Sequence, residues 1–451
     1  MIEAPSTEYR VPTIGTFAVS NGHSTSSGAE GAFHEIAGGV TAPKGFQAAG
    51  IYCGIRKVKK DIALITSEVP AEVAAVFTLN KTLAAPVIVD KLLVERSVGC
   101  SAIVVNSGNA NACTGEQGMR DAWTMVHETA SALNISDEEV LVSSTGVIGQ
   151  YMPMENVVNG IRLLPSQLSA NGSSDAAEAI MTTDTYAKEI AVEIRLPFKD
   201  DPNASPLLFK GGAGGGYETI RIGGIAKGSG MIQPNMATML AFLTTDAKIS
   251  RPLLQKTFAP LIDRSFNRIS VDGDTSTNDM AVLLANGRSG APEIQAGTKA
   301  FEMFSEALEF VLVRLAKMIA RDGEGATKLV EILVKGARSE AEALQAARAV
   351  ANSNLVKTAI HGSDANWGRI LAAVGYSGID FDPENVSLYF GELPILKPHY
   401  EIVIDEARAK ELFSLENITI TIDLHQGTES ANFWTCDLSK DYVHINASYR
   451  T

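Results

Sequence analysis

The chain has 451 residues, of which 45% are hydrophobic and 20% charged. This composition is typical of a globular protein with two to four domains and a sizeable apolar core. The net charge of −14, from 38 Lys and Arg against 52 Asp and Glu, disfavours nucleic acids and anionic membranes as partners. Both are bound through basic clusters, and the sequence contains none that stands out. We therefore expect small-molecule chemistry.

Cysteine and histidine spacings indicate neither a disulfide framework nor a metal site. The four cysteines follow no CxxC pattern, and the seven histidines form no HExxH pattern. We expect reduced thiols and a protein that uses no metal and no tightly bound cofactor.

Residues 1–33 are rich in Ser, Thr and Gly, and Arg10 is their only basic residue. We interpret them as a disordered or leader extension, because a secretory leader would be more basic at its start. No apolar segment approaches the length of a membrane span. We expect a cytoplasmic protein, or one of the plastid or mitochondrial matrix if residues 1–33 belong to a trimmed leader.

From residue 34, short apolar runs alternate with amphipathic segments. The first half of this region predicts buried strands at 101–105 and 139–142, which end in turns at 106–109 and 143–146. It predicts helices at 117–133, 153–164 and 174–182. Residues 198–216, with Asp-Asp-Pro-Asn and a glycine run, predict a long loop that joins strands at 189–196 and 217–222.

The second half begins with the apolar run 239–243 and continues with helices at 251–267 and 298–321. A strand at 329–334 follows, and Ser339 with Glu342 predicts the start of a helix that ends near residue 350. The last third predicts strands at 400–404, 417–423 and 442–446. Strands and helices interleave without a strict βαβ rhythm, which favours a layered α/β sandwich with mixed sheets over a Rossmann domain.

The glycine-rich segment 223–230, GGIAKGSG, does not fit a phosphate-binding loop. Lys227 has no glycine directly before it and no Ser or Thr directly after it. Flexibility explains the glycines better.

Thr238 stands between this segment and the apolar run. It is either an ordinary residue at the start of a core strand or a nucleophile. Threonine needs an adjacent base, and a chain that cuts itself just before the threonine supplies one, since the new α-amine lies beside Oγ. A flexible approach, the small residue Ala237 and a rigid strand after the cut all suit such a site.

The sequence around Thr238, GGIAKGSGMIQPNMATMLAFLTTDA, resembles the signature of the ornithine acetyltransferase family, the bifunctional ArgJ-type enzymes of arginine biosynthesis. Further segments resemble this family in matching order from about residue 34 to 451. These are NSGNANA (106–112), STGVIG (144–149), MTTDT (181–185), SFN (265–267), VDGDTSTND (271–279), DGEGAT (322–327), DANWGR (364–369) and the tail from Cys436 to Asn446.

The resemblance implies self-cleavage between Ala237 and Thr238. It divides the chain into an alpha chain, 34–237, and a beta chain, 238–451, which assemble as two of each. The implied fold is an α/β sandwich that is similar to the N-terminal-nucleophile hydrolases but differently connected.

The implied reaction moves an acetyl group from N2-acetylornithine to glutamate through an acetyl ester on Thr238, and many members also accept acetyl-CoA. By motif match, Thr145 and Gly146 provide the oxyanion hole. The family's substrate contacts match Thr182, Lys227, Thr238, Glu324, Asn446 and Thr451.

Two other readings remain open from the sequence. One is a self-processed N-terminal-threonine aminopeptidase or amidohydrolase, in which water resolves the acyl-enzyme. The other is an unprocessed binding protein without catalysis. Departures from the family pattern, such as Ala365 in place of the more usual proline and the long segment 198–216, do not touch the implied catalytic groups.

Overall fold

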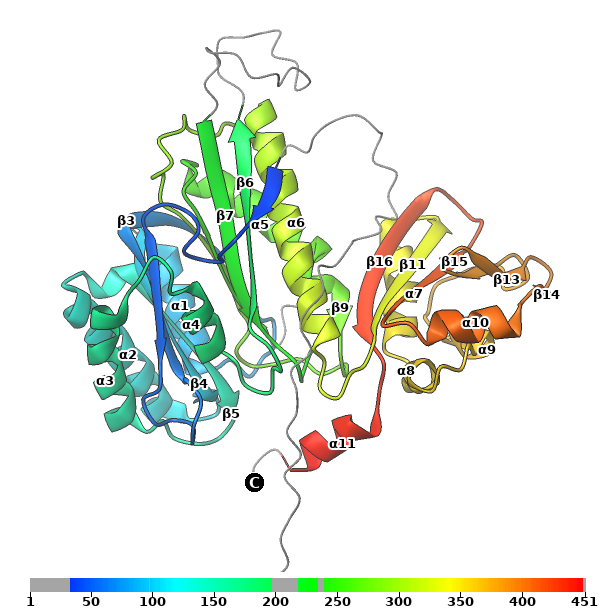
Figure 1. Ribbon diagram of the computed structural model, residues 1–451, viewed down its shortest axis with the longest axis horizontal. Coiled ribbons are helices and arrows are strands. Elements are labelled where there is room, and N and C mark those ends of the chain that lie inside the picture. Colours follow the sequence, from blue (N-terminus) through cyan, green and yellow to red (C-terminus); the bar gives the residue numbers. More distant parts are fainter. Residues whose placement is uncertain (1–32, 97, 197–217, 234–238, 449–451) are drawn as a thin grey trace, which may run out of the picture.

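The computed structural model describes residues 33–96, 98–196, 218–233 and 239–448, and they form two lobes, each built on one mixed sheet (Figure 1). In the described residues, the first lobe has a nine-stranded sheet in the order β1-β6-β7-β8-β10-β3-β4-β5, with β2 paired to β3. The strands are β1 (Phe33–Ile36), β2 (Phe46–Ile51), β3 (Ile62–Phe77), β4 (Cys100–Asn109), β5 (Val140–Val147), β6 (Lys188–Leu196), β7 (Glu218–Lys227), β8 (Leu240–Thr245) and β10 (Met280–Ala285).

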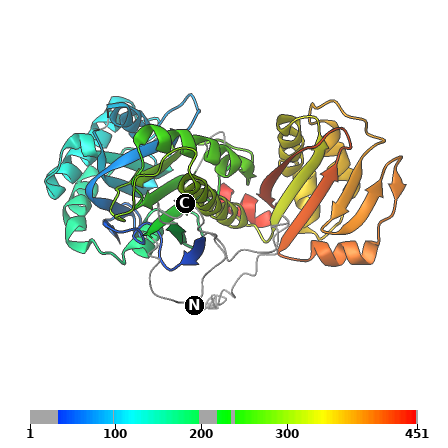
Figure 2. The ribbon, with the colours of Figure 1, turned by 90° about the horizontal axis from the view of Figure 1, so that it is seen from above.

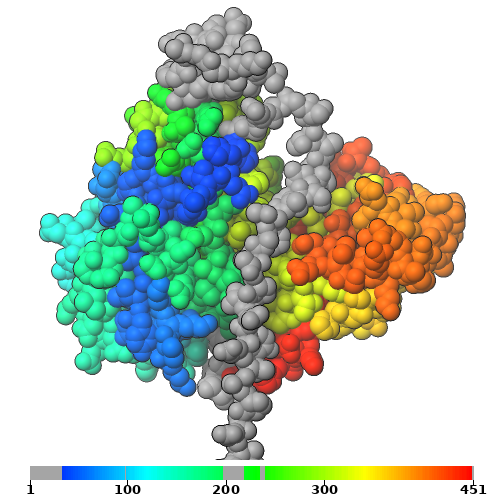
Figure 3. All heavy atoms as spheres, in the orientation of Figure 1, coloured from blue at the N-terminus to red at the C-terminus, as the bar shows by residue number. Residues whose placement is uncertain are grey.

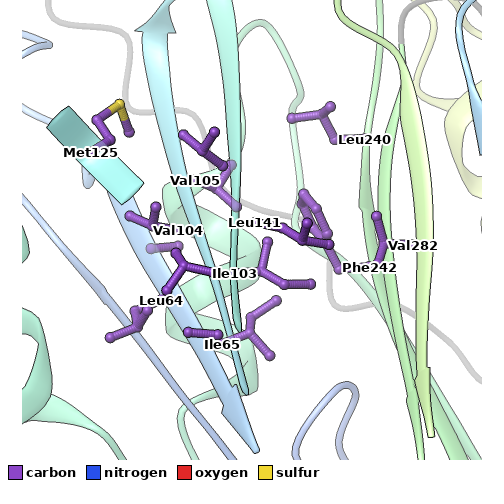
Figure 4. Packing of buried hydrophobic residues seen from close by; sticks show 14 of the residues in the cluster. Leu64, Ile65, Ile103, Val104, Val105, Met125, Leu141, Leu240, Phe242 and Val282 are labelled. Carbon is purple, nitrogen blue, oxygen red and sulfur yellow. The ribbon is translucent and has the colours of Figure 1, made fainter. Parts of the chain in front are cut away.

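The long strand β3 divides this sheet into two halves. Its first part pairs with β2 and β4, and its last part, residues 72–77, pairs with β10. Figure 4 shows the result: Ile65, Ile103 and Leu141 of one half face Phe242 and Leu240 of the other. The two halves therefore enclose an apolar core between them.

Helices cover the outer faces of both halves. One side carries α1 (Ala85–Arg96), α2 (Gly115–Leu133), α3 (Met154–Leu163) and α4 (Ser173–Ala179), and the other carries α5 (Arg251–Arg264) and α6 (Lys299–Arg321). Strand β8 shows the alternation that this layering requires: Leu240 and Phe242 join the inner core, whereas Ala241 and Leu243 pack with α5 and α6. The predicted layered α/β sandwich with mixed sheets is confirmed.

The second lobe lies beside the first (Figures 2 and 3). Its described strands form a seven-stranded sheet in the order β14-β13-β12-β15-β11-β16-β9. They are β9 (Ile269–Ser270), β11 (Leu329–Ala337), β12 (Ser387–Phe390), β13 (Leu393–Lys397), β14 (Glu401–Ile402), β15 (Asn417–Asp423) and β16 (Glu429–Cys436). The helices are α7 (Glu340–Ala351), α8 (Asn354–His361), α9 (Trp367–Gly375) and α10 (Glu406–Phe413). Strand β9 comes from first-lobe sequence, and its pairing with β16 joins the two lobes.

Most predicted elements are present, and three predictions are wrong. Residues 442–446 lie in helix α11 (Lys440–Ala447), whose start is capped by the Ser439 hydroxyl. Apolar and polar residues alternate here as they do in a strand. However, no residue of α11 is buried, so no packing against a core selects a strand over a helix. The predicted turns at 106–109 and 143–146 are also wrong, because β4 and β5 continue through both segments by pairing with each other.

The predicted connection at 198–216 joins neighbouring strands, as expected. β6 and β7 are antiparallel, with Leu196 opposite Glu218. Residues 197–217 themselves lie outside the described ranges.

The predicted division into two chains does not coincide with the division into lobes. β7 and β8, on either side of residues 237 and 238, are adjacent antiparallel strands, with Lys227 opposite Leu240. The division at 237/238 stays a prediction, and it falls inside one sheet. Across the described residues, no helix has the length and apolar character that crossing a membrane would take.

Candidate active site

Five of the predicted site residues gather where β5, β7 and α6 end. They are Thr145, Gly146, Thr182, Lys227 and Glu324, and Asn446 of α11 joins them through a hydrogen bond to Glu324. Ala237, Thr238 and Thr451 lie outside the described residues, so their predicted roles stay predictions. Figure 1 shows α11 below the ends of these elements.

Thr145 and Gly146 form an irregular end of β5. The register between β4 and β5 shifts at residues 108–109, and Gly146 has φ +136°. A Cβ at Gly146 would lie 2.3 Å from the carbonyl carbon of Gly108, so only glycine fits here. The Thr145 side chain is buried, with 7% of the residue exposed. The irregular end of β5 thus places the Thr145 hydroxyl and the Gly146 backbone at a sterically restricted position.

Asn278 holds the same strand end in place. Its side-chain amide donates to the backbone oxygens of Ala110, at 2.6 Å, and Ser144, at 2.8 Å. Asn278 therefore fixes the carbonyl that directly precedes Thr145.

Lys227 is a buried cation at the end of β7. It is 3% exposed, and its Nζ donates to the Thr145 Oγ1 at 3.4 Å. In the described ranges it forms no ion pair, and burial lowers its pKa while the nearby Asp184 carboxylate opposes that shift. Burying an ammonium group without an ion-pair partner lowers the stability of the fold. A bound anionic ligand would offset this loss by pairing with the ammonium.

Asp184 connects three parts of the site. Its Oδ1 accepts from the Lys188 Nζ and from the backbone N–H of Gly228, both at 2.7 Å, and its Oδ2 accepts from the backbone N–H of Thr182 at 2.9 Å. Burial alone would raise the pKa of Asp184, but the ammonium groups of Lys188 and Lys227 outweigh it and hold this pKa below the usual range.

Asp322, at the end of α6, is the second carboxylate on Lys188, at 2.5 Å. Its carboxylate also accepts from the backbone N–H and the hydroxyl of Thr185. Burial raises the pKa of Asp322, and Lys188 opposes this shift. Asp184, Lys188 and Asp322, which we call the buried triad, thus tie the loop at 182–185 to the end of α6.

Glu324 follows two residues later and is 7% exposed. Its backbone N–H donates to the Ser229 oxygen at 3.0 Å, and its carboxylate accepts from the Asn446 amide at 2.7 Å. A Cβ at Gly230 would lie 2.4 Å from this carboxylate, so the glycine is needed for the close approach. Two further glycines of the segment 223–230 also allow close packing, since Gly223 and Gly224 lie in β7 with Gly223 against the Gly39 carbonyl and Gly224 against Leu315.

Asp272 anchors the segment that follows Gly230. Its carboxylate accepts from the backbone N–H groups of Met231, at 2.6 Å, and Ile232, at 2.8 Å, and also from the Tyr442 hydroxyl. Asp272 thereby holds the backbone of residues 231–232, and Tyr442 of α11 in turn bonds to Asp272.

Asp279 is a further buried carboxyl that sequence reasoning missed. It is 1% exposed, and burial raises its pKa well above the usual range of a carboxyl, against the backbone N–H of Met239 and the charge of Lys227. Met239 directly follows Thr238 in the chain. Asp184, Asp279 and Asp322 all lie within the segments that carry the family resemblance, which was the only signal available for them.

Chemically, the described residues provide a buried cation, an irregular strand end with a hydroxyl, and a carboxylate near the cation. The cation suits an anionic group, the strand end suits developing negative charge on an oxygen, and the carboxylate suits an ammonium group. An amino-acid derivative carries all three complementary features.

Comparison with known proteins decides the family. Residues 47–451 match the ArgJ family along their whole length. The chain belongs to the ArgJ family. Among its ArgJ-family relatives, the arginine biosynthesis bifunctional protein ArgJ of Symbiobacterium thermophilum is 51% identical over 419 residues, which cover 92% of this chain and 99% of the relative. The protein of the same name from Chlorobaculum tepidum is 51% identical over 413 residues, or 91% of this chain and 96% of the relative.

Solved ArgJ-family structures align with parts of the chain. The arginine biosynthesis bifunctional protein ArgJ of Bacillus halodurans is 43% identical, with a TM-score of 0.45, over 46% of this chain and 98% of the solved chain. The ornithine acetyltransferase of Mycobacterium tuberculosis, solved with ornithine, is 33% identical, with a TM-score of 0.38, over 45% of this chain and 98% of the solved chain.

Proposed function

We propose that this chain is an acyltransferase of arginine biosynthesis that moves the acetyl group of N2-acetyl-L-ornithine to L-glutamate. The observation that carries the proposal is its membership of the ArgJ family over nearly its full length, at about half identity to relatives named for arginine biosynthesis. The site chemistry supports it, because both substrates carry an α-carboxylate for which the unpaired Lys227 is the complementary cation.

The nucleophile in this proposal is Thr238, released as a new N-terminus by self-cleavage. Thr238 Oγ attacks the Ala237 carbonyl, the peptide C–N bond breaks to give an ester and a free Thr238 amine, and water then hydrolyses the ester. The α-amine has an ordinary pKa of about 7.7–8.0, so near neutral pH much of it can act as the base for Oγ.

The acetyl transfer then follows a double displacement. The Thr238 amine takes the Oγ proton while Oγ bonds to the acetyl carbon, and negative charge develops on the acetyl oxygen. The Thr145 hydroxyl and the Gly146 N–H donate to that oxygen. The C–N bond to ornithine breaks as its nitrogen takes the proton back from the Thr238 ammonium. The amine of glutamate attacks the acetyl ester by the same steps in reverse.

The remaining predicted contacts orient the substrates. Glu324, held by Asn446, binds the side-chain ammonium of ornithine, and Thr182 and Thr451 contribute hydrogen bonds. If Thr451 touches substrate, a tag at the C-terminus lowers activity whereas a tag at the N-terminus does not. Acetyl-CoA is a further acetyl donor in this proposal, and no other cofactor enters the reaction.

We place the reaction in the cytoplasm, and we propose that the protein assembles as two alpha and two beta chains. Native mass against denatured mass tests this stoichiometry, since a protein that remains one protomer in solution contradicts it.

Intact mass under denaturing conditions tests the central claim. Active protein should give two species, residues 1–237 and 238–451 or a trimmed form of the first, whereas Thr238→Ala should give one uncut chain without activity. Thr238→Ser keeps a hydroxyl and should still be cut. A single uncut species of 47.9 kDa in active wild-type protein would contradict the mechanism.

Product analysis distinguishes transfer from hydrolysis. The proposal predicts ornithine release that depends on glutamate, with ping-pong kinetics. Free acetate formed at the same rate with and without glutamate would instead favour an amidohydrolase.

A further inference from the structure

Two buried lysines compete for one carboxylate in this site. Lys188 is fully buried, and its Nζ lies 2.7 Å from the Asp184 Oδ1 and 2.5 Å from the Asp322 Oδ2. Lys227 lies close enough for its charge to act on Asp184, yet it makes no ion pair with any residue that the structure describes. The shared carboxylate is therefore taken by only one of its two cations.

The backbone explains why both lysines lie near Asp184. Lys188 begins β6 and Lys227 ends β7, and these strands pair with Lys188 opposite Ala226. Asp184 also accepts from the N–H of Gly228, the residue after Lys227. The Lys227 side chain therefore starts beside Asp184 but extends toward Thr145, which belongs to another strand.

We propose that Lys188 is a positioning residue: by occupying Asp184, it keeps the ammonium of Lys227 unpaired and available to the carboxylate of an amino-acid substrate. This inference rests on the proposed function, because that function supplies a substrate carboxylate. Among the carboxylates, Asp184 acts most strongly on Lys227, so in the absence of Lys188 the two pair before substrate arrives.

The charges of the buried triad support this role. With both carboxylates ionised, the triad carries one net negative charge, which balances the positive charge of Lys227 without a direct ion pair. A buried ammonium is stabilised by such a nearby charge even when its hydrogen-bond donors stay unused. Asp322 is the second anchor of Lys188, at 2.5 Å from its Nζ.

Two variants separate this role from a general contribution to folding. Asp322→Asn leaves Lys188 on Asp184. The double variant Lys188→Met, Asp322→Asn leaves Lys227 as the cation that acts on Asp184. The double variant has a balanced set of one carboxylate and one ammonium, so net charge alone would favour it over the single variant.

The proposal predicts the opposite order. For Asp322→Asn, we expect KM values for N2-acetylornithine and glutamate within about threefold of wild type, because Lys227 stays free. For the double variant, we expect both KM values to rise by about tenfold or more, the effect of losing one charge-assisted hydrogen bond. In a crystal structure of the double variant, Lys227 Nζ should lie within ion-pair distance, about 4 Å, of Asp184.

Lys357→Met is the matched control for the loss of a buried lysine. The Lys357 Nζ donates to Thr435 and Cys436 of the second lobe, so this variant should melt at a lower temperature without a rise in either KM.

The inference fails if the double variant keeps wild-type KM values or if its Lys227 remains on Thr145. If the double variant does not fold, the KM values of Asp322→Asn still test the inference, since a tenfold rise in them contradicts it. Wild-type protein that transfers no acetyl group contradicts the proposed function instead, so the two failures are distinguishable.

Discussion

Two buried lysines, Lys328 of the second lobe and Lys227 of the first, are held in opposite ways. In the second lobe, the Lys328 Nζ donates to the backbone oxygens of Ile360 and Phe413, each at 2.6 Å, and to the Ser363 hydroxyl at 2.9 Å. Those oxygens belong to the last turns of α8 and α10, so Lys328 satisfies two helix C-termini at once. In the first lobe, Lys227 donates within the described residues only to the Thr145 hydroxyl, at the longer distance of 3.4 Å.

The difference teaches how to separate a structural buried lysine from one that binds a ligand. Both have a pKa lowered by burial, so burial and pKa do not distinguish them. What differs is the use of the three N–H donors. All three N–H donors of Lys328 bind protein acceptors, whereas Lys227 keeps donors available for an incoming group.

The largest expected effect is a loss of kcat on substitution of Thr145, the residue to which Lys227 donates. Thr145→Val removes the side-chain donor of the oxyanion hole and should lower kcat by about 10²–10³-fold, because the charge on the acetyl oxygen loses one hydrogen bond. Single-turnover formation of the acetyl-enzyme measures this step.

Ser143→Ala is the control on the same strand. The Ser143 hydroxyl is fully buried and has no hydrogen-bond partner in the described part of the chain. Its removal should change kcat little. Equal losses in the two variants would mean that the strand, and not the Thr145 hydroxyl, was damaged.

Lys227→Met should lower kcat/KM by about 10²-fold through KM for both amino-acid substrates, since a charged hydrogen bond to each carboxylate is lost. The free energy of unfolding should not fall, because the variant also removes a buried charge that has no ion-pair partner. Steady-state kinetics and denaturant unfolding check the two halves of this prediction. A large loss of stability would place Lys227 with the structural lysines.

Lys328→Met should do the reverse. It leaves two helix C-termini without their donor and should lower the free energy of unfolding by about 2–4 kcal/mol, with both KM values unchanged below the melting range. The exposed Lys299, which pairs with the exposed Glu302, is the control, and Lys299→Met should change stability by less than about 0.5 kcal/mol. A raised KM in Lys328→Met would contradict the view that Lys328 is structural and Lys227 binds substrate.

The smallest effect is a pH dependence of substrate affinity. The Lys227 ammonium exists below its pKa, and burial lowers this pKa against the opposing Asp184. KM for N2-acetylornithine should therefore rise with pH at lower values than an ordinary lysine, with its pKa of about 10.4, would give. Lys227→Arg keeps its charge throughout and should flatten the profile over the same range, even if its overall affinity is lower. Identical profiles would exclude titration of Lys227 as the cause.

The layered fold was predictable because it follows from local patterns. The apolar run of β8, the amphipathic face of α6 and the cap at Ser339 are all readable within a few residues. Helix α11 was not predictable in this way, since nothing buried selects between helix and strand for residues 442–446.

The site was predictable only in part. Thr145, Gly146, Lys227 and Glu324 came from the family resemblance, and the structure brings them together. The buried triad has no sequence signal of its own, because Lys188 meets Asp322 across 134 positions of the chain. Periodicity and spacing do not report which buried charges share a partner at such separation.

The adjacency of β7 and β8 has a consequence for handling the protein. A cut between residues 237 and 238 would leave the two products joined by a full ladder of strand hydrogen bonds, from Ile222 opposite Thr245 to Lys227 opposite Leu240. An affinity tag on either product would then retain both on a column until denaturant is added. Products synthesised as separate polypeptides would each expose an unpaired edge of this sheet, and we expect them to aggregate unless they are expressed together.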